Sequence, residues 1–336
     1  MKTPKPRKLP SGSWHVQLRL GGESIPITAA TETECTRQAE MIKAEYRSGR
    51  RSSRLAPRDL TLRMCMDNYI KRYTAVLSPS TVRGYEQIRD NRFPAYMDKP
   101  IRSIDFQRMI NDELRSKSEK TVQNAWFFTH ACLKYAGVPV PDVRLATVPV
   151  NEIPFLQPEE IRPFCDAVKG RSYEIPVLLE LHGLRMSEML ALTWDKVDLK
   201  AGTVTVLGAR VRGPDGFVDK RTNKNRSSTR TVPIMIPQLT DALKAVEDKT
   251  GRVSTVTPGV LLEDVKRSCK RAGVTVVGNH GLRHSFASLC YHLGINERQL
   301  MAWGGWSDYT TMHKIYIRLA RSDESKARNT VSAFFS

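Results

Sequence analysis

Two histidines and an arginine lie close together in the stretch NHGLRHSFASLC, residues 279–290. His280 and Arg283 are three positions apart at the start of a predicted helix, and His284 follows directly. A helix N-terminus attracts anions, so a cationic cradle for a phosphate accounts for all three side chains. A zinc site would use the histidines at i and i+4, but the glutamate of H-E-x-x-H and an obvious third ligand are missing. An ordinary core helix explains the apolar second half of the stretch but not its polar start.

A second arginine stands at a predicted break between two helices in LHGLRMSEMLALTWDKVDL. One helix is predicted to end near Gly183 and the next to begin near Ser187, which places Arg185 at the positive end of the second helix. A planar guanidinium in that place can hold two phosphate oxygens at once. The alternative is a surface arginine that caps the helix or pairs with Glu188.

Two further stretches contain side chains that can take part in chemistry. TNKNRSSTRTVPI is a run of charged and hydroxyl residues before a predicted strand, and it suggests a hairpin tip carrying Lys224. Its alternative reading is a solvated loop. GGWSDYTTMHKIYIRLA contains Trp306, Tyr309 and Tyr316, each of which, taken singly, is more often a packing residue.

The composition narrows the class of partner. The chain has 336 residues and a formal net charge of +18, which favours a polyanion such as nucleic acid, because each phosphate contact releases counterions. A ribosome-associated or merely soluble basic protein is the plainer alternative. No apolar run approaches the ~20 residues of a membrane span, and no signal peptide is recognisable. The six cysteines are scattered without a C-x-x-C pair, which predicts reduced thiols in a cytoplasmic protein.

Three predicted domains must position these side chains. Residues 1–56 are predicted to form a small sheet that carries one helix, and residues 57–147 a helical domain. Residues 153–336 are predicted to mix helices with a few strands. In this third domain, strands at residues 202–211 and 230–236 flank the basic segment.

Taken in chain order, the four stretches resemble the tyrosine recombinases, and phage and mobile-element integrases in particular, over residues 153–320. GLRMSEMLALTW resembles the first arginine box of the family. KNRSSTRTVPI resembles its K-T-x-x-S-x-R-x-[IV]-P segment, with Asn225 in place of the usual threonine. HGLRHSFAS resembles the H-x-L-R-H-T-x-A box. GGWSDYTTMHKIY resembles the G-H-S-x-x-x-T-x-x-x-Y segment, with Trp306 in place of the common histidine.

The resemblance implies an enzyme that cleaves and rejoins DNA through a 3′-phosphotyrosyl intermediate, with no metal and no cofactor. Tyr316 lies ten residues after Trp306 and fits the family's spacing of nine or ten, whereas Tyr309 lies three residues after it. The implied site consists of the catalytic residues Arg185, Lys224, His280, Arg283, Trp306 and the nucleophile Tyr316, with Glu188 and His284 as auxiliary residues.

The implied roles follow phosphoryl-transfer chemistry. The two arginines and the indole N–H of Trp306 would stabilise the charge on the non-bridging oxygens. Lys224 would be the general acid for the departing 5′ oxygen, His280 would assist proton removal from the tyrosine, and Glu188 would orient Arg185.

The same resemblance sets the expected fold and partners. The fold is expected to be mainly α and multidomain, with an arm-type DNA-binding domain, a helical core-binding (SAM-like) domain and a mixed α+β catalytic domain. The expected partners are double-stranded DNA at core and arm sites and further copies in a homotetramer. An excisionase and a host DNA-bending protein are candidate partners, a membrane is not, and the expected location is the cytoplasm of a bacterial host. A type IB topoisomerase and an inactive DNA-binding regulator on the same scaffold are the rival functions.

Overall fold

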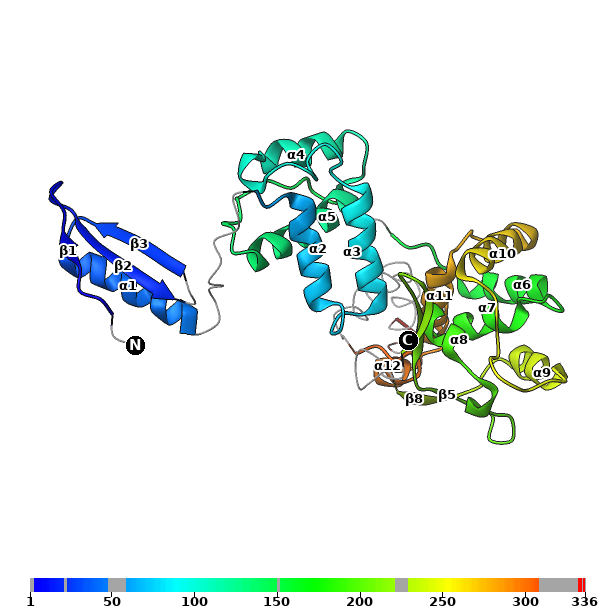
Figure 1. The fold of residues 1–336 in the computed structure, drawn as a ribbon. Coiled ribbons are helices and arrows are strands. Elements are labelled where there is room, and N and C mark those ends of the chain that lie inside the picture. The colour runs from blue at the N-terminus through cyan, green and yellow to red at the C-terminus, as the bar shows by residue number, and fades with distance from the viewer. Residues whose placement is uncertain are drawn as a thin grey trace. The chain divides into compact units, whose positions relative to one another are not determined.

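The computed structural model describes residues 3–20, 23–47, 59–149, 152–220, 229–307, 332, 333 and 335. The chain divides into two compact units, Met1–Pro149 and Val150–Ser336, drawn in Figure 1. Helices dominate both units, with small sheets in each, which confirms the mainly α prediction. The predicted finer division into residues 1–56, 57–147 and 153–336 remains a prediction.

The first unit begins with a three-stranded antiparallel sheet and one helix. These elements are β1 (Arg7–Lys8), β2 (Trp14–Leu20), β3 (Glu23–Ala29) and α1 (Glu32–Arg47), in the sheet order β1-β2-β3. Val16, Leu18 and Leu20 alternate with exposed residues along β2, so one face of the sheet is apolar. That face packs with Cys35 and Ala39 of α1 in a small hydrophobic cluster.

A second hydrophobic cluster of the first unit is built from helices. They are α2 (Leu62–Tyr73), α3 (Pro79–Asn91), a short 3-10 helix (Ile101–Ser103), α4 (Phe106–Leu114) and α5 (Glu119–Tyr135). Figure 1 shows α2 and α3 side by side with α4 across one end, and α5 contacts both α2 and α4. Side chains of Thr61, Asp105 and Ser118 cap the starts of α2, α4 and α5, which fixes where these helices begin. The helix α3 begins at Pro79 directly after Ser78, and both residues favour a helix start.

The second unit surrounds a central pair of helices with further helices and a small sheet. The helices are α6 (Pro158–Val168), α7 (Glu174–Leu181), α8 (Met186–Ala191), a 3-10 helix (Trp194–Lys196), α9 (Pro237–Ala245), α10 (Pro258–Ala272), α11 (Asn279–His292) and α12 (Glu297–Gly304). The central pair is α7 and α11, which lie side by side (Figure 1). Leu178, Leu179 and Leu282 are fully or almost fully buried in the cluster that they share.

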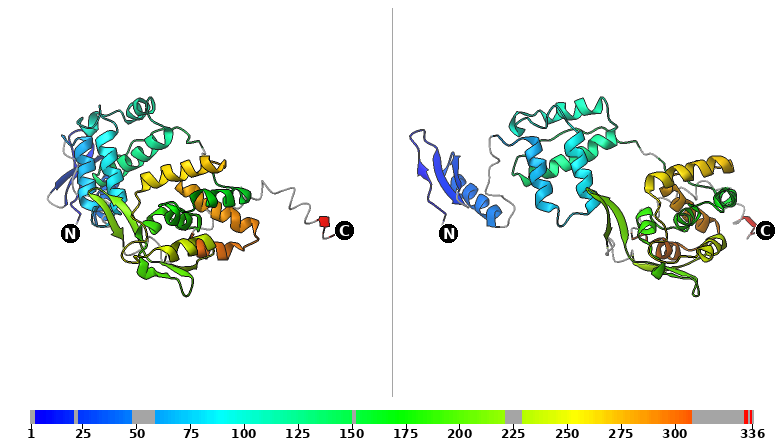
Figure 2. Two further views of the ribbon diagram at one scale, coloured as in Figure 1. Left: turned by 90° about the vertical axis from the view of Figure 1, so that its right-hand side faces the viewer. Right: turned by 45° about the vertical axis from the view of Figure 1, so that its right-hand side comes forward.

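The strands of this unit differ from the prediction. The sheet consists of β4 (Val197–Asp198), β5 (Thr203–Val206) and β8 (Arg230–Pro233), while β6 (Ala209–Gly213) and β7 (Gly216–Lys220) pair only with each other among the described residues. The single strand predicted over residues 202–211 is therefore wrong. The apolar positions change phase between Val206 and Leu207, where the chain leaves the sheet after β5 and starts a separate hairpin, seen in Figure 2 as a narrow ribbon.

Two expectations about the chain as a whole can be compared with the described residues. None of their helices combines the length and the apolar character that a membrane span requires. All six cysteines are free thiols; Cys165 is half-buried and the others are buried.

Glu180 of α7 is an unusual member of the core. It is 1% exposed, and neither carboxylate oxygen has a hydrogen-bond partner among the described residues. Burial in apolar surroundings disfavours the charged form and raises the pKa of this carboxyl to about 8. Glu180 is therefore mostly protonated at neutral pH and behaves as a neutral core residue.

We expect the substitution Glu180→Gln to remove a pH dependence of folding stability in the second unit. The folded carboxyl titrates near pH 8 and the unfolded one near its ordinary pKa, so its stability contribution is full at low pH and is lost as the pH rises through this window. Urea unfolding of wild type and variant at pH 5 and pH 8 measures this contribution. The free energy of unfolding of the variant minus that of wild type should be about 2–4 kcal/mol larger at pH 8 than at pH 5.

The matched control is Glu263→Gln, which changes an exposed carboxylate paired with Lys266 at 3.0 Å. Its free energy of unfolding relative to wild type should change by less than about 0.5 kcal/mol between the two pH values. An equal difference between Glu180→Gln and wild type at pH 5 and pH 8 would show that Glu180 is not a buried neutral acid.

Candidate active site

The turn between α7 and α8 positions Arg185. Gly183 adopts a φ of +93°, and a Cβ there would lie 2.7 Å from the ring of Phe286, so the turn requires glycine on both counts. The chain then enters α8 with Arg185 as its N-cap residue. The predicted break between the helices is confirmed, and it places the guanidinium at the N-terminal end of α8.

The start of α11 positions the second arginine. Arg283 is the fifth residue of this helix, is 2% exposed, and donates a hydrogen bond to the backbone carbonyl of Gly183. The turn that presents Arg185 thus also accepts a bond from Arg283. Although the two arginines are far apart in the sequence, the charge of Arg185 helps to lower the pKa of Arg283.

Trp306 joins the arginines from the segment after α12. Gly305 ends that helix in the left-handed conformation, with a φ of +66°, and Trp306 follows it. The guanidinium carbon of Arg283 lies 3.8 Å from the centre of the indole ring, a close cation–π contact. A side chain at Gly304 would overlap that ring, so the glycine leaves room for it. The contact uses the face of the ring and not the N–H at its edge.

A buried carboxylate, Glu188, connects these elements. It is 3% exposed and accepts hydrogen bonds from Arg185 through the backbone N–H at 2.9 Å and Nη1 at 2.6 Å. It also accepts two hydrogen bonds from Arg230, from Nη1 at 3.2 Å and from Nη2 at 2.9 Å. Arg185 in turn donates from Nη2 to the carbonyl of Gly305 at 2.7 Å. This arrangement of Arg185, Glu188, Arg230 and Gly305 is called the carboxylate network below.

Arg230 is a residue of the site that the sequence reasoning missed. It is the first residue of β8, and it was passed over in favour of Lys224 in the same stretch. The arginine position inside the resembling motif, S-x-R-x-[IV]-P, was the signal that could have identified it.

The charges of the site act on one another. Burial would raise the pKa of Glu188, but the hydrogen bonds and charges of Arg230 and Arg185 outweigh it, so the pKa lies below its usual range. Burial lowers the pKa of Arg283 to about 9, and the charges of Arg185 and Arg230 act in the same direction. Arg283 still carries its charge at neutral pH. Its Nη2 is buried with no hydrogen-bond partner among the described residues.

Two histidines lie at the edge of the arginine pair. The rings of His280 and His284 meet edge to face, with centroids 4.7 Å apart. Partial burial lowers the pKa of His280, and the charges of Arg283 and Arg185 add to this effect. His280 is therefore neutral near pH 7, and its exposed ring can accept a proton.

Two of the predicted site residues cannot be placed. Lys224 and Tyr316 lie outside the described residues, as does the rival Tyr309. The structure brings together the other predicted residues, which are Arg185, Glu188, His280, Arg283, His284 and Trp306.

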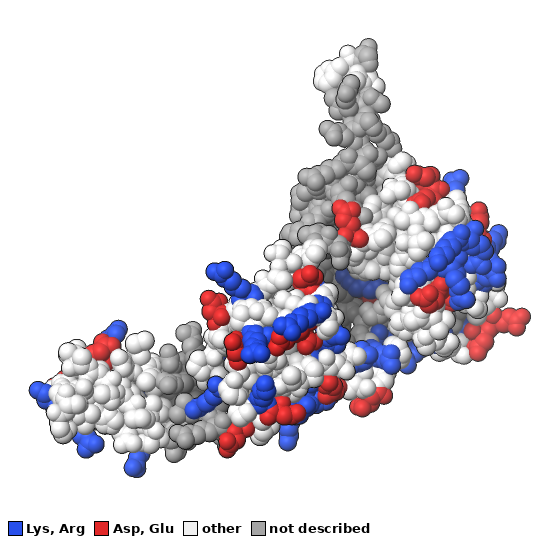
Figure 3. All heavy atoms as spheres, turned by 90° about the horizontal axis from the view of Figure 1, so that it is seen from above, with Lys and Arg blue, Asp and Glu red and all other residues white. Residues whose placement is uncertain are grey.

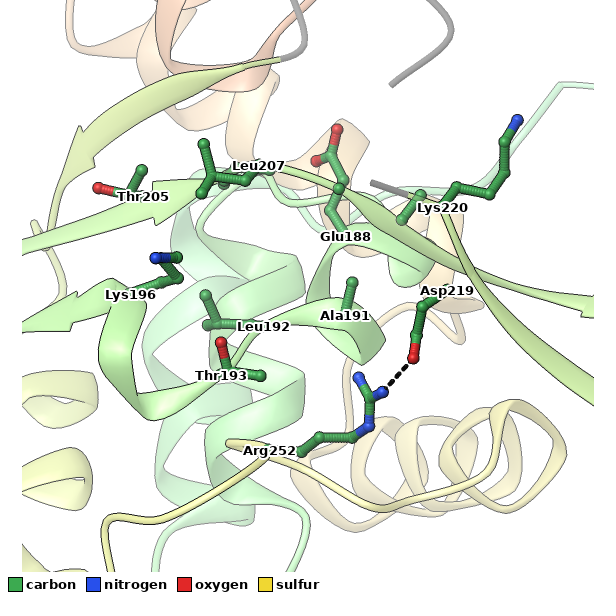
Figure 4. A pocket seen from close by; sticks show the side chains of 13 residues that line it. Glu188, Ala191, Leu192, Thr193, Lys196, Thr205, Leu207, Asp219, Lys220 and Arg252 are labelled. Atoms are coloured by element: carbon green, nitrogen blue, oxygen red, sulfur yellow. Dashed lines mark hydrogen bonds and ion pairs between the residues drawn. The ribbon is translucent and has the colours of Figure 1, made fainter. Parts of the chain in front are cut away.

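A pocket of about 340 Å³ lies beside the carboxylate network (Figure 4). Glu188 borders it together with Lys196 and Lys220, and Arg252 and Asp219 pair in its wall at 2.5 Å. Neither of the two predicted catalytic arginines lines it, so we place the phosphate with the arginines and not in this pocket.

The surface of the second unit carries basic residues suited to a polyanion. Arg267, Lys270 and Arg271 of α10 are exposed. Figure 3 shows Lys and Arg side chains gathered on this unit, at the right of the view. Such a surface attracts the phosphates of nucleic acid.

Comparison with known proteins agrees with this site. A model of the phage integrase family matches residues 154–323. The tyrosine recombinase XerC-like protein of Caldanaerobacter subterraneus subsp. tengcongensis is 25% identical over 89% of this chain and 90% of its own. The tyrosine recombinase XerD of Neisseria meningitidis serogroup B is 30% identical over 43% of this chain and 50% of its own.

Solved structures show the same fold. The Tn1549 transposon integrase in complex with transposon right end DNA matches with a TM-score of 0.63 at 18% identity, over 80% of this chain and 99% of that chain. A lambda integrase tetramer bound to a Holliday junction matches with a TM-score of 0.58 at 16% identity, over 93% and 95%. The family match spans half of the chain and includes the two arginines, and the chain therefore belongs to the phage integrase family and is a tyrosine site-specific recombinase.

Proposed function

We propose that this recombinase integrates the DNA of a phage or another mobile element into a bacterial chromosome, and that it also excises that DNA. The observation that carries the proposal is the meeting of Arg185, Arg283 and Trp306. They come from the start of α8, the N-terminal part of α11 and the segment after α12, and the guanidinium of Arg283 contacts the ring of Trp306 and is influenced by the charge of Arg185. A cluster of cations with a buried donor that has no partner among the described residues fits the charge of a phosphodiester.

The proposed reaction transfers a phosphoryl group from DNA to the enzyme and back. The Tyr316 oxygen forms a bond to phosphorus while the bond from phosphorus to the 5′ oxygen breaks. The 3′ phosphate stays on the tyrosine, and Lys224 supplies the proton that the departing 5′ oxygen needs. Attack by a second 5′-hydroxyl reverses these steps on the recombined strand, so the bond energy is conserved in the phosphotyrosyl link.

The described residues contribute to this reaction in separate ways. Arg185 and Arg283 hold the non-bridging oxygens, on which negative charge grows as phosphorus becomes five-coordinate. Trp306 adds an indole N–H donor. A phenol has a pKa near 10, so its proton must leave during the attack, and the neutral His280 accepts it. Glu188 orients Arg185 through their 2.6 Å ion pair, and His284 supports the ring of His280.

The proposed partners are DNA sites and further copies of the chain. Recombination of two duplexes needs four cleavages, so four protomers act together. Residues 1–56 are proposed to bind a separate arm site and residues 57–147 to bind the core site beside the catalytic domain. An excisionase and a host DNA-bending protein complete the proposed assembly, which works in the cytoplasm of a bacterial host.

The substitution Tyr316→Phe tests the nucleophile. It removes only the attacking oxygen, so we expect core-site DNA to bind within about twofold of wild type while covalent product falls below detection. The substrate is a duplex of the core sequence found in the DNA beside the gene. A nick near the cleavage point lets the short fragment that carries the new 5′-hydroxyl leave, which traps the phosphotyrosyl adduct.

The matched control is Tyr309→Phe, which removes the other phenol of the same segment and should form the adduct at the wild-type rate. Peptide mapping of the wild-type adduct should identify Tyr316. An adduct that persists in Tyr316→Phe, or that maps to Tyr309, would refute the assignment.

Deletion of residues 1–56 tests the arm-type domain. Two linked DNA contacts raise the effective concentration of the enzyme at its site without changing the chemistry. The shortened chain should therefore cleave a core duplex at the wild-type rate, while integration into a full attachment site falls by about 10²-fold or more. A plasmid integration assay and the nicked core duplex, run side by side, measure both. Integration at the wild-type rate would contradict the role given to these residues.

A further inference from the structure

Arg230 is buried in the second unit and makes contacts on two sides. Its side chain is 7% exposed, and its Nε donates to the backbone carbonyl of Trp303 at 2.7 Å. The two terminal nitrogens donate to the two oxygens of Glu188, in the paired geometry that a planar guanidinium allows. One side chain of β8 thus binds both α8 and α12.

The contact with Glu188 leads directly to Arg185. The same two carboxylate oxygens accept hydrogen bonds from the backbone N–H and from Nη1 of Arg185. With Arg230 in place, the carboxylate has a fixed plane and a full set of donors. Any rotation of Glu188 would therefore displace the guanidinium of Arg185.

The contact with α12 leads to Trp306. Gly305 packs so closely on Arg230 that a Cβ at Gly305 would lie 2.6 Å from Nη1. The carbonyl of Gly305 accepts a hydrogen bond from Arg185, and the next residue, Trp306, covers the guanidinium of Arg283. The end of α12 is therefore held between the two arginines of the carboxylate network.

We propose that Arg230 is a positioning residue for recombination, and the proposal rests on the function proposed above. It sets the plane of Glu188 and the end of α12, and through them the places of Arg185 and Trp306 around the phosphate. Arg230 is too deeply buried to touch DNA, so it acts through its neighbours and is not a third phosphate-binding arginine. Errors of about 1 Å in such groups cost about 10²-fold in rate.

The rival role is a plain counterion for a buried carboxylate. A counterion needs only a positive charge, which lysine also supplies. The positioning role needs three donors in a rigid fork, and lysine has a single nitrogen that cannot bond both oxygens of Glu188 and the Trp303 carbonyl in the same geometry. The substitution Arg230→Lys therefore separates the two roles, and Arg230→Gln removes both.

The test measures the single-turnover rate constant of covalent adduct formation on the nicked core duplex, with protein in saturating excess. It is run well below the unfolding temperature of every variant. A loss of stability alone lowers the amplitude of the reaction, because only the folded fraction reacts, but leaves the rate constant unchanged. A displaced arginine lowers the rate constant itself.

We expect Arg230→Lys to slow adduct formation by about 10-fold and Arg230→Gln by about 10²-fold, with the affinity for the core duplex within about threefold of wild type. The matched control is Arg252→Lys. Arg252 is less buried than Arg230, with 25% of its side chain exposed, but it too bonds a carboxylate and a backbone carbonyl, those of Asp219 and Leu190. Among the described residues it makes no bond to the carboxylate network. Its rate constant should stay within about twofold of wild type.

The outcomes separate the two proposals. Arg230→Lys still decides the question if Arg230→Gln does not fold, because it keeps the charge beside Glu188. A rate constant for Arg230→Lys within about twofold of wild type overturns the positioning role and leaves the proposed function standing. If the wild-type protein itself forms no adduct, the proposed function falls, and the role of Arg230 falls with it.

Discussion

The site depends on one buried negative charge. Glu188 is almost fully removed from water, and a carboxylate in that place is stable only if donors surround it. Arg185 and Arg230 supply those donors from opposite directions. The pairing draws the start of α8, the first residue of β8 and the end of α12 to one point. Around it the remaining side chains of the site are arranged.

The pairing also explains how three arginines can share one site. Arg230 is buried and bonded on both sides, so its charge serves the structure. Arg185 is bonded to Glu188 but remains 36% exposed, so its guanidinium can also meet a ligand. Arg283 lies under the ring of Trp306 with one nitrogen unbonded among the described residues. Burial lowers the pKa of Arg283, and the charges of Arg185 and Arg230 lower it further. A phosphodiester would supply the missing negative charge, which makes binding of that group favourable.

The sequence predicted those parts of the site that depend on local order. The glycine before Arg185 marked the break between α7 and α8, and the spacing of His280 and Arg283 placed both near the start of one helix. Each of these features depends on residues that are neighbours in the chain, so a pattern of a few residues is enough to predict it.

Features that depend on distant partners could not be predicted. The alternation over residues 202–211 changes phase between Val206 and Leu207, but this break alone does not show that the chain passes from one sheet to another after β5. Arg230 is one arginine among many until β8 places it against Glu188 and Trp303. Glu180 looks like a polar position on a helix, and only the packing of α7 shows it to be buried with no hydrogen-bond partner among the residues that the structure describes.

The central claim is that Arg283 and Arg185 stabilise negative charge on the phosphate that is cleaved. Replacing one non-bridging oxygen of that phosphate by a methyl group removes the charge and leaves the leaving group unchanged. Adduct formation by wild type and by Arg283→Ala would be compared on the natural and the neutral core duplex. The account predicts a loss of about 10²–10³-fold for the variant on the natural phosphate and less than about tenfold on the neutral one. An equal loss on both substrates would show that Arg283 does not act through the phosphate charge.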